Sequence, residues 1–498
     1  MDQRSAEVSA QQIDADDLGF FRWGRVGGRV LLTNDAGDWA FLSEDELAEL
    51  FAGKVVEGHA RFEEFRGKGF LRDGLDLDAF AARIAQRNRH VRRGAYVHVV
   101  TLTHAGREGG QTTAQQGGDM SLETAETIAH FALAGLSPAM SFEFQGAAGE
   151  PLSNFAALRH FVETAQTENK RTTGKHLTFS VQTNFTAMTE EVAEWLIANE
   201  VLVCTRLDGP ARVHDANRQH VGGSTHSDTI RWIEYFHRRY AELQRDPQQW
   251  HVEGRLAVTR DTLSAAREVL DEYVQRGMHS IHLHPLDASR FGDEVWAKIG
   301  YSPEEYLDFY RDTLETILEL NRRGVALAEG MATIVLIKIL TADDPGIVDI
   351  QSPYGAGTGQ IAYDADGALY PCDEARAAGG GTTFALGNVS ELAVEDLAAH
   401  PTVRAIASAS LLDAQPMCAD CWNKPYCGFS PVRNFISQGD LFGQRTKCFE
   451  CKEHMAVSTM LFEKLADESD ADTRAILERW TVTRPAHAID TRAVKDAF

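Results

Sequence analysis

The sequence has little cysteine and little positive charge, and both shortages limit what the chain can do. Its 498 residues include seven cysteines, too few for a disulfide framework. Lysine and arginine total 49 against 73 acidic residues, which gives a formal net charge of −24. No run or stripe of basic residues reverses this charge locally, so nucleic acid and anionic membrane surfaces would be repelled. We therefore expect neither as a partner.

The sequence also lacks a long apolar segment. The longest apolar run, residues 331–340, is interrupted by Lys338 and is too short to cross a bilayer. The first residues are polar and acidic, without the apolar region of a secretory signal. Hydrophobic residues still make up 43% of the chain, enough for buried cores. These features predict a cytoplasmic protein of two or three folded domains.

The first folded part is a small module of strands followed by helices. Residues 1–19 are polar and expected to be flexible, and residues 20–43 contain short apolar stretches with turn signals at Gly27-Gly28 and Asn34-Asp35. Helical patterns follow at 44–52 and 59–68. This order and size favour a winged-helix-like module, which with a charged connector occupies residues 20–93.

Residues 94–345 alternate between strand and helix patterns. Apolar strand candidates lie at 96–103, 139–145, 177–182, 201–207, 251–259 and 280–285, and helical patterns at 121–134, 190–198, 264–275 and 302–323. Six successive βα units predict an α/β domain with a parallel sheet, either doubly wound or a partial barrel. In both architectures a ligand binds at the carboxyl ends of the strands.

Residues 346–455 form a segment rich in glycine, proline and cysteine. A hairpin is predicted at 362–370 with its turn at Asp366-Gly367. Six of the seven cysteines lie between Cys372 and Cys451. Cys204 stands alone on an apolar strand, where a buried and inert thiol is expected. Residues 456–498 are predicted to form one further helix and a polar tail.

The clustered cysteines have the spacing of a metal site. Cys418 and Cys421 form a Cys-x-x-Cys pair, Cys427 follows after five residues, and Cys448 lies farther along. Four thiolates complete a tetrahedral set for either zinc or a 4Fe–4S cluster, and spacing alone does not separate the two. Cys451 is an alternative fourth ligand.

Several ordered stretches resemble one known family. They are "LLTNDAGDWAFLS", "DMSLETAE", "LDGPARVHDANR", "IGYSPEEYLDFY", "GAGTGQIAYDADGALYPCDEAR" and "KPYCGFSPVRN". Residues 352–448 resemble the SPASM extension of radical S-adenosylmethionine (SAM) enzymes, and residues 20–461 resemble the HxsB-type maturases of His-Xaa-Ser peptide systems. The resemblance implies a partial (β/α)6 TIM barrel, an auxiliary cluster domain and a peptide-binding winged helix.

The residues that would bind SAM in such a family are altered here. Radical initiation needs three cysteines in the loop after the first barrel strand, but that loop contains none. The aligned positions are His104, Glu108 and Gln111. The family's Gly-Gly-Glu-Pro run is lengthened around Gly149 and Glu150, and Arg206 stands where a small serine is usual. The resemblance therefore implies a degenerate site that does not bind SAM.

This chain keeps the ligands of one of the family's two auxiliary clusters but not those of the other. The positions implied for the first cluster hold Tyr354, Cys372 and Ser430, so two of its three distinctive ligands are lost. The second set corresponds to Cys418, Cys421, Cys427 and Cys448, all of which are present. We therefore expect one 4Fe–4S cluster, or a structural zinc ion, in the extension.

Taken with the resemblance, these residues predict a pseudoenzyme of ribosomal-peptide maturation. The chain would bind a precursor peptide and act with a second, active radical SAM maturase without cleaving SAM itself. An electron-transferring maturase subunit is a rival interpretation. Another is an enzyme with a non-radical, mononuclear metal site in the barrel mouth. Its candidate ligands are His98, His104, Glu108, His282 and His284.

Overall fold

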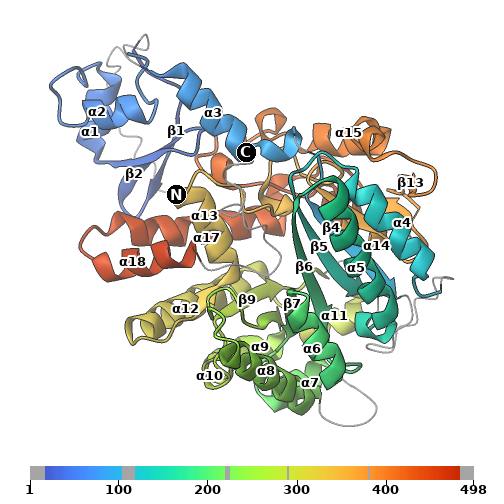
Figure 1. The fold of residues 1–498 in the computed structure, drawn as a ribbon. Coiled ribbons are helices and arrows are strands. Elements are labelled where there is room, and N and C mark those ends of the chain that lie inside the picture. Colours follow the sequence, from blue (N-terminus) through green and yellow to red (C-terminus); the bar gives the residue numbers. More distant parts are fainter. Residues whose placement is uncertain are drawn as a thin grey trace.

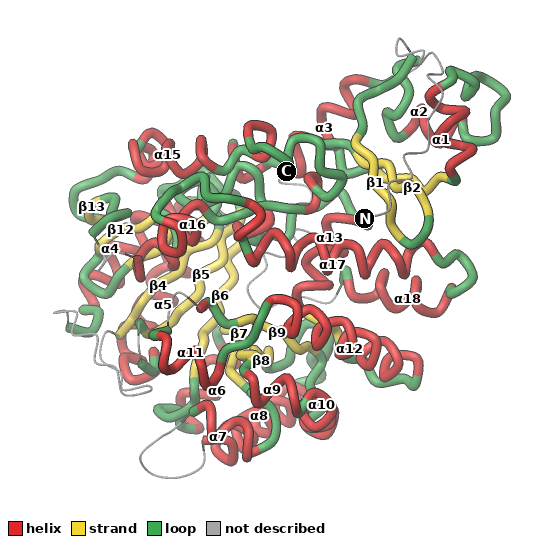
Figure 2. Tube along the Cα trace, turned by 180° about the vertical axis from the view of Figure 1, so that it is seen from behind, coloured by secondary structure: helices red, strands yellow, loops and turns green. Residues whose placement is uncertain are grey.

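The chain folds into three regions that contact one another. A computed structural model describes residues 17–73, 75–92, 94–103, 118–147, 149–218, 225–288, 291–378 and 382–482. Figure 1 shows an N-terminal module, a central sheet with its helices, and a C-terminal extension. The view from behind in Figure 2 shows that the extension lies against both of the other regions.

The N-terminal module is a three-stranded antiparallel sheet with three helices. Its elements are β1 Arg22–Val26, β2 Arg29–Thr33, β3 Trp39–Leu42, α1 Glu44–Phe51, α2 Phe62–Gly67 and α3 Leu77–Arg87, followed by the short turn η1 Arg89–Val91. Gly27 and Gly28 form the turn between β1 and β2 with φ of 58° and 74°, which glycine adopts without strain. Ser43 and Glu46 form a capping box at the start of α1. The predicted β-then-α module is therefore present.

The central region alternates strands and helices as the periodicity predicts. Its strands are β4 Val97–Thr103, β5 Ala139–Gly146, β6 His176–Thr183, β7 Val201–Arg206, β8 Glu253–Val258, β9 Ser280–Pro285 and β10 Ala328–Glu329. Its helices are α4 Leu122–Leu133, η2 Pro151–Asn154, α5 Phe155–Thr172, α6 Glu190–Ala198, α7 Ala211–Asn217, α8 Thr225–Glu242, α9 Arg260–Ser264, α10 Ala266–Gln275, α11 Asp293–Ile299, α12 Pro303–Arg322 and α13 Gly330–Leu340.

The extension adds strands to the same sheet and then continues as short helices. Its elements are η4 Val348–Ile350, β11 Gln360–Tyr363, β12 Ala368–Tyr370, α14 Asp373–Ala377, β13 Gly387–Asn388, η6 Val394–Ala399, α15 Pro401–Ala409, η7 Leu412–Ala414, η8 Lys424–Tyr426, α16 Pro431–Gln438, η9 Arg445–Lys447, α17 Phe449–Ala466 and α18 Ala471–Trp480. Gly367, with φ of 83°, makes the turn of the hairpin that the Asp-Gly pair predicts.

The central sheet is open and mostly parallel. Its ten strands run in the order β10-β9-β8-β7-β6-β5-β4-β11-β12-β13, and β11 pairs in parallel with β4 before the hairpin turns back. The strands β10 and β13 form the two edges, so within the described residues the sheet does not close on itself. The predicted α/β class with a partial barrel is confirmed, because the βα units run in sequence order across one parallel sheet.

The two faces of β4 are buried against different partners. Val100 and Leu102 pack into the core that the sheet shares with the helices around it. Val97 and Val99, on the other face, pack against the extension. Figures 1 and 2 show α4 and α5 on one side of these strands and α16 on the other. A strand buried on both faces reads as a continuous apolar run rather than as an alternating pattern.

The C-terminal part contains two helices where the sequence predicts one. The first, α17, begins at Phe449 inside the cysteine-rich segment, and the second, α18, follows after a short turn. Cys448 has an extended backbone and forms the N-cap of α17. The early start is hidden in the sequence because the first turn has one apolar residue, Phe449, beside a cysteine and two charged residues. None of the helices in the described ranges combines the length and apolar character needed to span a membrane.

The helix α17 joins the N-terminal module to the extension through Phe462. This ring lies 5.4 Å from Trp39, 5.7 Å from Trp422 and 5.4 Å from Tyr426, measured between ring centroids. Its centroid is also 6.1 Å from Phe41. Edge-to-face contacts of this kind add to the free energy gained by burying the rings. One aromatic cluster thus spans both regions.

We expect Phe462→Ala to lower the free energy of unfolding by about 3–5 kcal/mol, because it leaves a cavity among four aromatic rings. Phe442→Ala is the matched control, since Phe442 is 52% exposed. Urea unfolding of the two variants measures the difference. Equal losses in both would contradict a joining role for α17.

Candidate functional site

Three of the predicted metal-binding cysteines lie on one compact loop, the cysteine loop of residues 418–427. The amide of Cys421 donates to the carbonyl of Cys418 at 3.1 Å, and the amide of Cys427 donates to Lys424 at 3.2 Å. Met417, directly before the loop, has a φ of 69°. Successive tight turns therefore place Cys418, Cys421 and Cys427 close together along a short stretch of chain.

Burial and mutual proximity raise the pKa values of these thiols. The pKa of Cys418 is raised to about 11, chiefly by burial and also by the neighbouring thiols of Cys451 and Cys421. Burial, followed by the charges of Cys421, Cys451 and Cys418, raises the pKa of Cys427. Crowded thiolates repel one another, and a bound cation relieves that repulsion while displacing their protons.

Three cations from different parts of the chain oppose the charge of these thiolates. They are Arg445 beside Cys418, Arg22 beside Cys421 and Lys338 beside Cys427. Lys338 lies on α13, where its ammonium donates to the carbonyl of Ile350, and burial lowers its pKa to about 8. A tetrathiolate site with zinc or a 4Fe–4S cluster carries a net charge of about −2. The surrounding charges therefore suit such a site.

Cys448 lies in a different environment. Its thiol donates to Glu450 Oε2 at 2.8 Å, and Arg445 donates to its sulfur at 3.9 Å. Its pKa is raised to about 12, first by burial and then by the carboxylate of Glu450. Nowhere in the described part of the chain do three His, Cys, Asp or Glu side chains already surround a point as metal ligands do.

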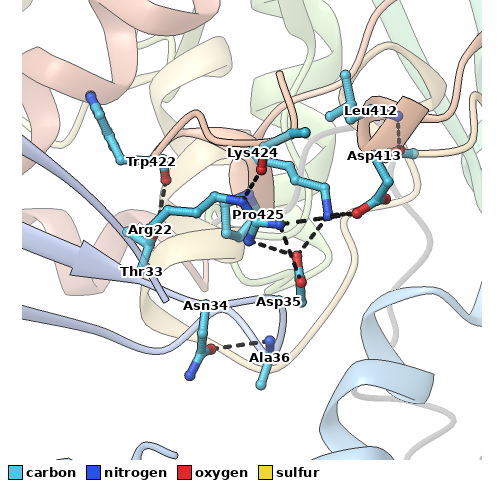
Figure 3. A network of polar contacts seen from close by, with 12 residues as sticks. Arg22, Thr33, Asn34, Asp35, Ala36, Leu412, Asp413, Trp422, Lys424 and Pro425 are labelled. Carbon is cyan, nitrogen blue, oxygen red and sulfur yellow. Dashed lines mark hydrogen bonds and ion pairs between the residues drawn. The ribbon is translucent and has the colours of Figure 1, made fainter. Parts of the chain in front are cut away.

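The N-terminal module holds the cysteine loop through a partly buried ionic network (Figure 3). Asp35 accepts from Arg22 Nη1 at 3.0 Å and from Lys424 Nζ at 2.9 Å. Lys424, between Cys421 and Cys427, also pairs with Asp413. The side chains of Arg22 and Lys424 are only 4% and 8% exposed. Burial raises the pKa of Asp35, but Lys424 and Arg22 outweigh it, and the pKa is lowered overall.

Further hydrogen bonds attach the backbone of the loop to the module. Arg22 Nε donates to the carbonyl of Ala419, and Thr33 Oγ1 donates to that of Trp422 at 2.7 Å. In the opposite direction, the hydroxyl of Tyr426 donates to the carbonyl of Gly37 in the module at 3.1 Å. The cysteine loop is therefore positioned from outside as well as by its own turns.

The three residues predicted at the lost cluster converge around Glu374. The hydroxyl of Tyr354 donates to Glu374 Oε2 at 2.7 Å and lies 3.7 Å from the sulfur of Cys372. Ser430 Oγ donates to the same carboxylate at 3.2 Å, and Arg433 Nε donates to its other oxygen at 2.7 Å. A hydrogen-bonded carboxylate thus lies among the positions where the resemblance implies cluster ligands.

The predicted SAM-site positions are only partly described. His104, Glu108 and Gln111 lie outside the described residues. Gly149 follows the end of β5 and Arg206 ends β7, so both lie at the carboxyl edge of the sheet, where parallel-sheet ligands bind.

Glu150 stabilises the local backbone at this edge. Its Oε1 accepts from the amide of Leu152 at 3.0 Å and from Thr183 Oγ1 at 2.8 Å. Its Oε2 accepts from the amide of Asn184 at 2.7 Å. This carboxylate therefore caps η2 and fixes the end of β6.

On the sheet face opposite α4 and α5, mostly polar side chains line a small cavity. A small cavity of about 10 Å³ is lined by Glu143, Phe144, Gln145, Ser180, Gln182, Cys204 and Arg255. It has room for about one water molecule. Arg255 Nη1 donates to Gln182 Oε1 at 3.0 Å. Cys204 is buried, as the sequence predicts, and burial raises its pKa to about 12.

The histidines proposed for a mononuclear metal do not converge among the described residues. The rings of His282 and His284 lie 5.7 Å apart. Burial, then His282 and the guanidinium groups of Arg433, Arg255 and Arg206, lower the pKa of His284 well below its ordinary value. A metal cation there would be repelled by the same guanidinium groups.

His98 lies on the other face of the sheet. It pairs in register with Phe142, stacks on that ring at 5.0 Å, and its Nδ1 lies 2.8 Å from the hydroxyl of Tyr363. Phe142 packs against Phe161 of α5 at 5.1 Å. His98 therefore faces the helices, whereas His282 is in register with the cavity-lining Arg255.

Sequence reasoning missed the ionic groups that position these sites. In the sequence Asp35 stands out only as part of a turn signal, and Lys424 does not stand out at all. Glu374 and Arg433 stand beside positions assigned to the lost cluster. A charged residue within or next to a ligand motif is the signal available for each. It does not identify the partner, because the partners are far away in the sequence.

Comparison with known proteins gives two kinds of similarity. No protein-family model matches the chain. Over 271 residues the chain is 27% identical to the cysteine-type anaerobic sulfatase-maturating enzyme of two Clostridium perfringens strains. The alignment covers 52% of this chain and 64% of those enzymes, so the chain spans less than two thirds of these relatives.

Solved structures resemble the chain over more of its length. Native anSMEcpe with bound AdoMet and Cp18Cys peptide has a TM-score of 0.61 at 19% identity, covering 76% of this chain and 99% of that one. Streptococcus suis SuiB bound to S-adenosylmethionine has a TM-score of 0.51 at 13% identity, covering 87% and 98%. The chain therefore has the fold of radical SAM maturases and, over about half its length, sequence similarity to one of them.

The ionic network predicts a stability loss on removal of one cation. We expect Lys424→Met to lower the free energy of unfolding by about 1 kcal/mol, because hydrogen bonds to charged groups are lost at a contact whose carboxylates are partly exposed to water. Lys170→Met on the exposed end of α5 is the control. Urea denaturation compares them, and an equal effect in both variants would rule out a holding role for Lys424.

Burial of His98 predicts an acid-dependent loss of stability. Burial lowers the pKa of His98 from 6.5 to about 3, so between these values the unfolded chain binds a proton that the folded chain does not. The stabilisation is complete above pH 6.5 and falls towards pH 3, by at most about 1.4 kcal/mol per pH unit. We expect His98→Phe to reduce this slope in unfolding experiments.

The control for this experiment is His130→Phe, because the side chain of His130 is 47% exposed. It should leave the pH dependence of the unfolding free energy unchanged. A slope that His98→Phe does not alter would contradict the buried neutral state of His98.

Proposed function

We propose that this chain is a degenerate relative of radical SAM/SPASM maturases that acts in the modification of ribosomally made peptides. It would bind a precursor peptide of the His-Xaa-Ser type and assist a second, active maturase without cleaving SAM. The observation that carries the proposal is the absence of cysteine from the sequence that follows β4, residues 104–117. The donor set available there does not fit the cluster that radical chemistry requires.

The carboxyl edge of the sheet supports the same proposal. Glu150 already accepts three hydrogen bonds from its own surroundings. Arg206 ends β7 with a cationic group close enough to lower the pKa of His284. SAM is a sulfonium cation, and a guanidinium group at this edge disfavours its binding through charge repulsion.

Peptide binding is supported by the module and by the structural neighbours. Structures of anSMEcpe with Cp18Cys peptide and of SuiB with precursor peptide SuiA share the fold. In this module the carbonyls of Trp39 and Phe41 on β3 accept from Lys68 and Arg61. The other outer strand, β1, carries Trp23, which is 43% exposed. An extended peptide that adds a strand to the sheet would therefore pair with β1.

The cysteine loop is proposed to hold a structural metal group. Cys418, Cys421 and Cys427 supply thiolate donors that suit zinc and iron equally. When bound, the metal cross-links the loop, and its binding free energy adds to that of folding. The contacts from Arg22 and Thr33 carry this stabilisation to the peptide-binding module.

We expect the anaerobically purified and iron–sulfide-reconstituted chain to form no 5′-deoxyadenosine from SAM under strong reduction. The physical reason is the missing three-cysteine site. Liquid chromatography of the quenched reaction measures the product, and an active radical SAM maturase treated identically shows that the assay works. Product above the protein-free background would refute the pseudoenzyme assignment.

Peptide binding is tested on the full chain, because the N-terminal module shares a hydrophobic core with α17. A synthetic precursor with His-Xaa-Ser repeats should bind in calorimetry, and Trp23→Ala should weaken binding. Val56→Ala is the control, since Val56 is also exposed, at 55%, but lies outside β1. Failure of the unmodified chain to bind would remove the peptide role.

A further inference from the structure

One face of α17 is directed at the cysteine loop. Cys451 and His454 are three residues apart on this helix and so share a face. His454 Nδ1 lies 3.6 Å from the sulfur of Cys427. The side-chain amide of Asn423, within the loop, donates to the carbonyl of His454 at 3.3 Å. The first two turns of α17 therefore lie against the loop that carries three cysteines.

Cys451 lies within electrostatic reach of every cysteine on that loop. Its charge contributes to the raised pKa of Cys418, of Cys421 and of Cys427, in each case after burial as the largest cause. The effect agrees with the helix geometry, which brings Cys451 to the same side as His454. Cys451 and the three cysteines of the loop therefore lie on two segments that contact each other through His454.

Cys448 forms its hydrogen bonds with residues outside the cysteine loop. Its thiol donates to Glu450 at 2.8 Å, and Asn434 Oδ1 lies 3.9 Å from its sulfur. Glu450 in turn forms an ion pair with Arg433 at 3.5 Å, and Arg433 binds Glu374 at the lost-cluster positions. Cys448 therefore belongs to the hydrogen-bonded network around Arg433.

We propose that Cys451, and not Cys448, is the fourth thiolate of the metal site formed with Cys418, Cys421 and Cys427. This inference rests on the proposed metal-binding role of the loop and identifies its last ligand. Cys448 then serves as the hydrogen-bonded N-cap of α17. The spacing of the family's cluster motif favours Cys448, so the structure and the motif differ at this residue.

The three cations around the loop agree with this ligand set. Arg445 opposes the charge of Cys418, of Cys451 and also of Cys448, so it does not by itself choose between the last two. Arg22 and Lys338 oppose Cys421 and Cys427. Every member of the set therefore has a cationic neighbour to offset the excess negative charge of a tetrathiolate site.

The test compares Cys451→Ser with Cys448→Ser in the full chain. Each protein is purified anaerobically, and zinc, iron and sulfide are counted per chain. The metal-free proteins are then titrated with Co²⁺, whose thiolate charge-transfer absorption reports the thiolates bound. We expect Cys451→Ser to weaken Co²⁺ binding by at least about tenfold, as loss of a ligand exceeds loss of an outer-shell partner. Cys448→Ser should bind like the unmodified chain.

Two further variants test whether weaker Co²⁺ binding results from misfolding rather than from loss of a ligand. Cys204→Ser removes a buried thiol away from the loop and should leave Co²⁺ binding unchanged. Cys451→His retains a ligand at the same position, so it should bind more tightly than Cys451→Ser, with weaker charge-transfer absorption than the unmodified chain. Binding of Co²⁺ by Cys451→Ser as tight as in the unmodified chain would count against Cys451 as a ligand.

The outcomes separate the inference from the proposed function. Loss of metal in Cys448→Ser, with or without loss in Cys451→Ser, overturns the assignment of the fourth ligand while leaving a metal site in place. Unchanged binding in both variants overturns it as well. An unmodified chain that retains no zinc or iron and shows no cobalt–thiolate absorption refutes the metal site itself.

Discussion

The contact between the N-terminal module and the cysteine loop is the constraint on which the arrangement of the three regions depends. Asp35 pairs with both Arg22 and Lys424, and these cations are almost completely buried. A charge removed from water is tolerated only where its partner stays in place. Because Lys424 stands between two cysteines, the position of the module and the shape of the loop are fixed together.

The extension also contacts the central sheet directly. Strand β11 extends the parallel sheet beside β4, and the opposite face of β4 belongs to the helix-packed core. Tyr354 and Cys372 pack with Val97 and Val99 in one cluster. The extension is therefore built on the sheet rather than attached by a linker.

The sequence predicts the fold better than the site, for physical reasons. Periodicity and turn residues act locally, so the βα units and the Asp366-Gly367 hairpin follow from the sequence. The choice between Cys448 and Cys451 depends on where α17 begins and which side faces the loop, and spacing does not contain this information. The face on which His98 lies is equally hidden, because β4 is buried on both sides.

The balance of charge distinguishes the two cysteine-containing regions of the extension. Around Arg433, one guanidinium group is shared by Asp349, Glu374 and Glu450, so negative charge is already supplied by carboxylates. A further anionic cluster beside them would be repelled. Around the cysteine loop the thiols have Arg445, Arg22 and Lys338 as cationic neighbours, and Arg22 is also paired with Asp35. The charges there agree with the one metal site that we propose, at the loop that the N-terminal module holds.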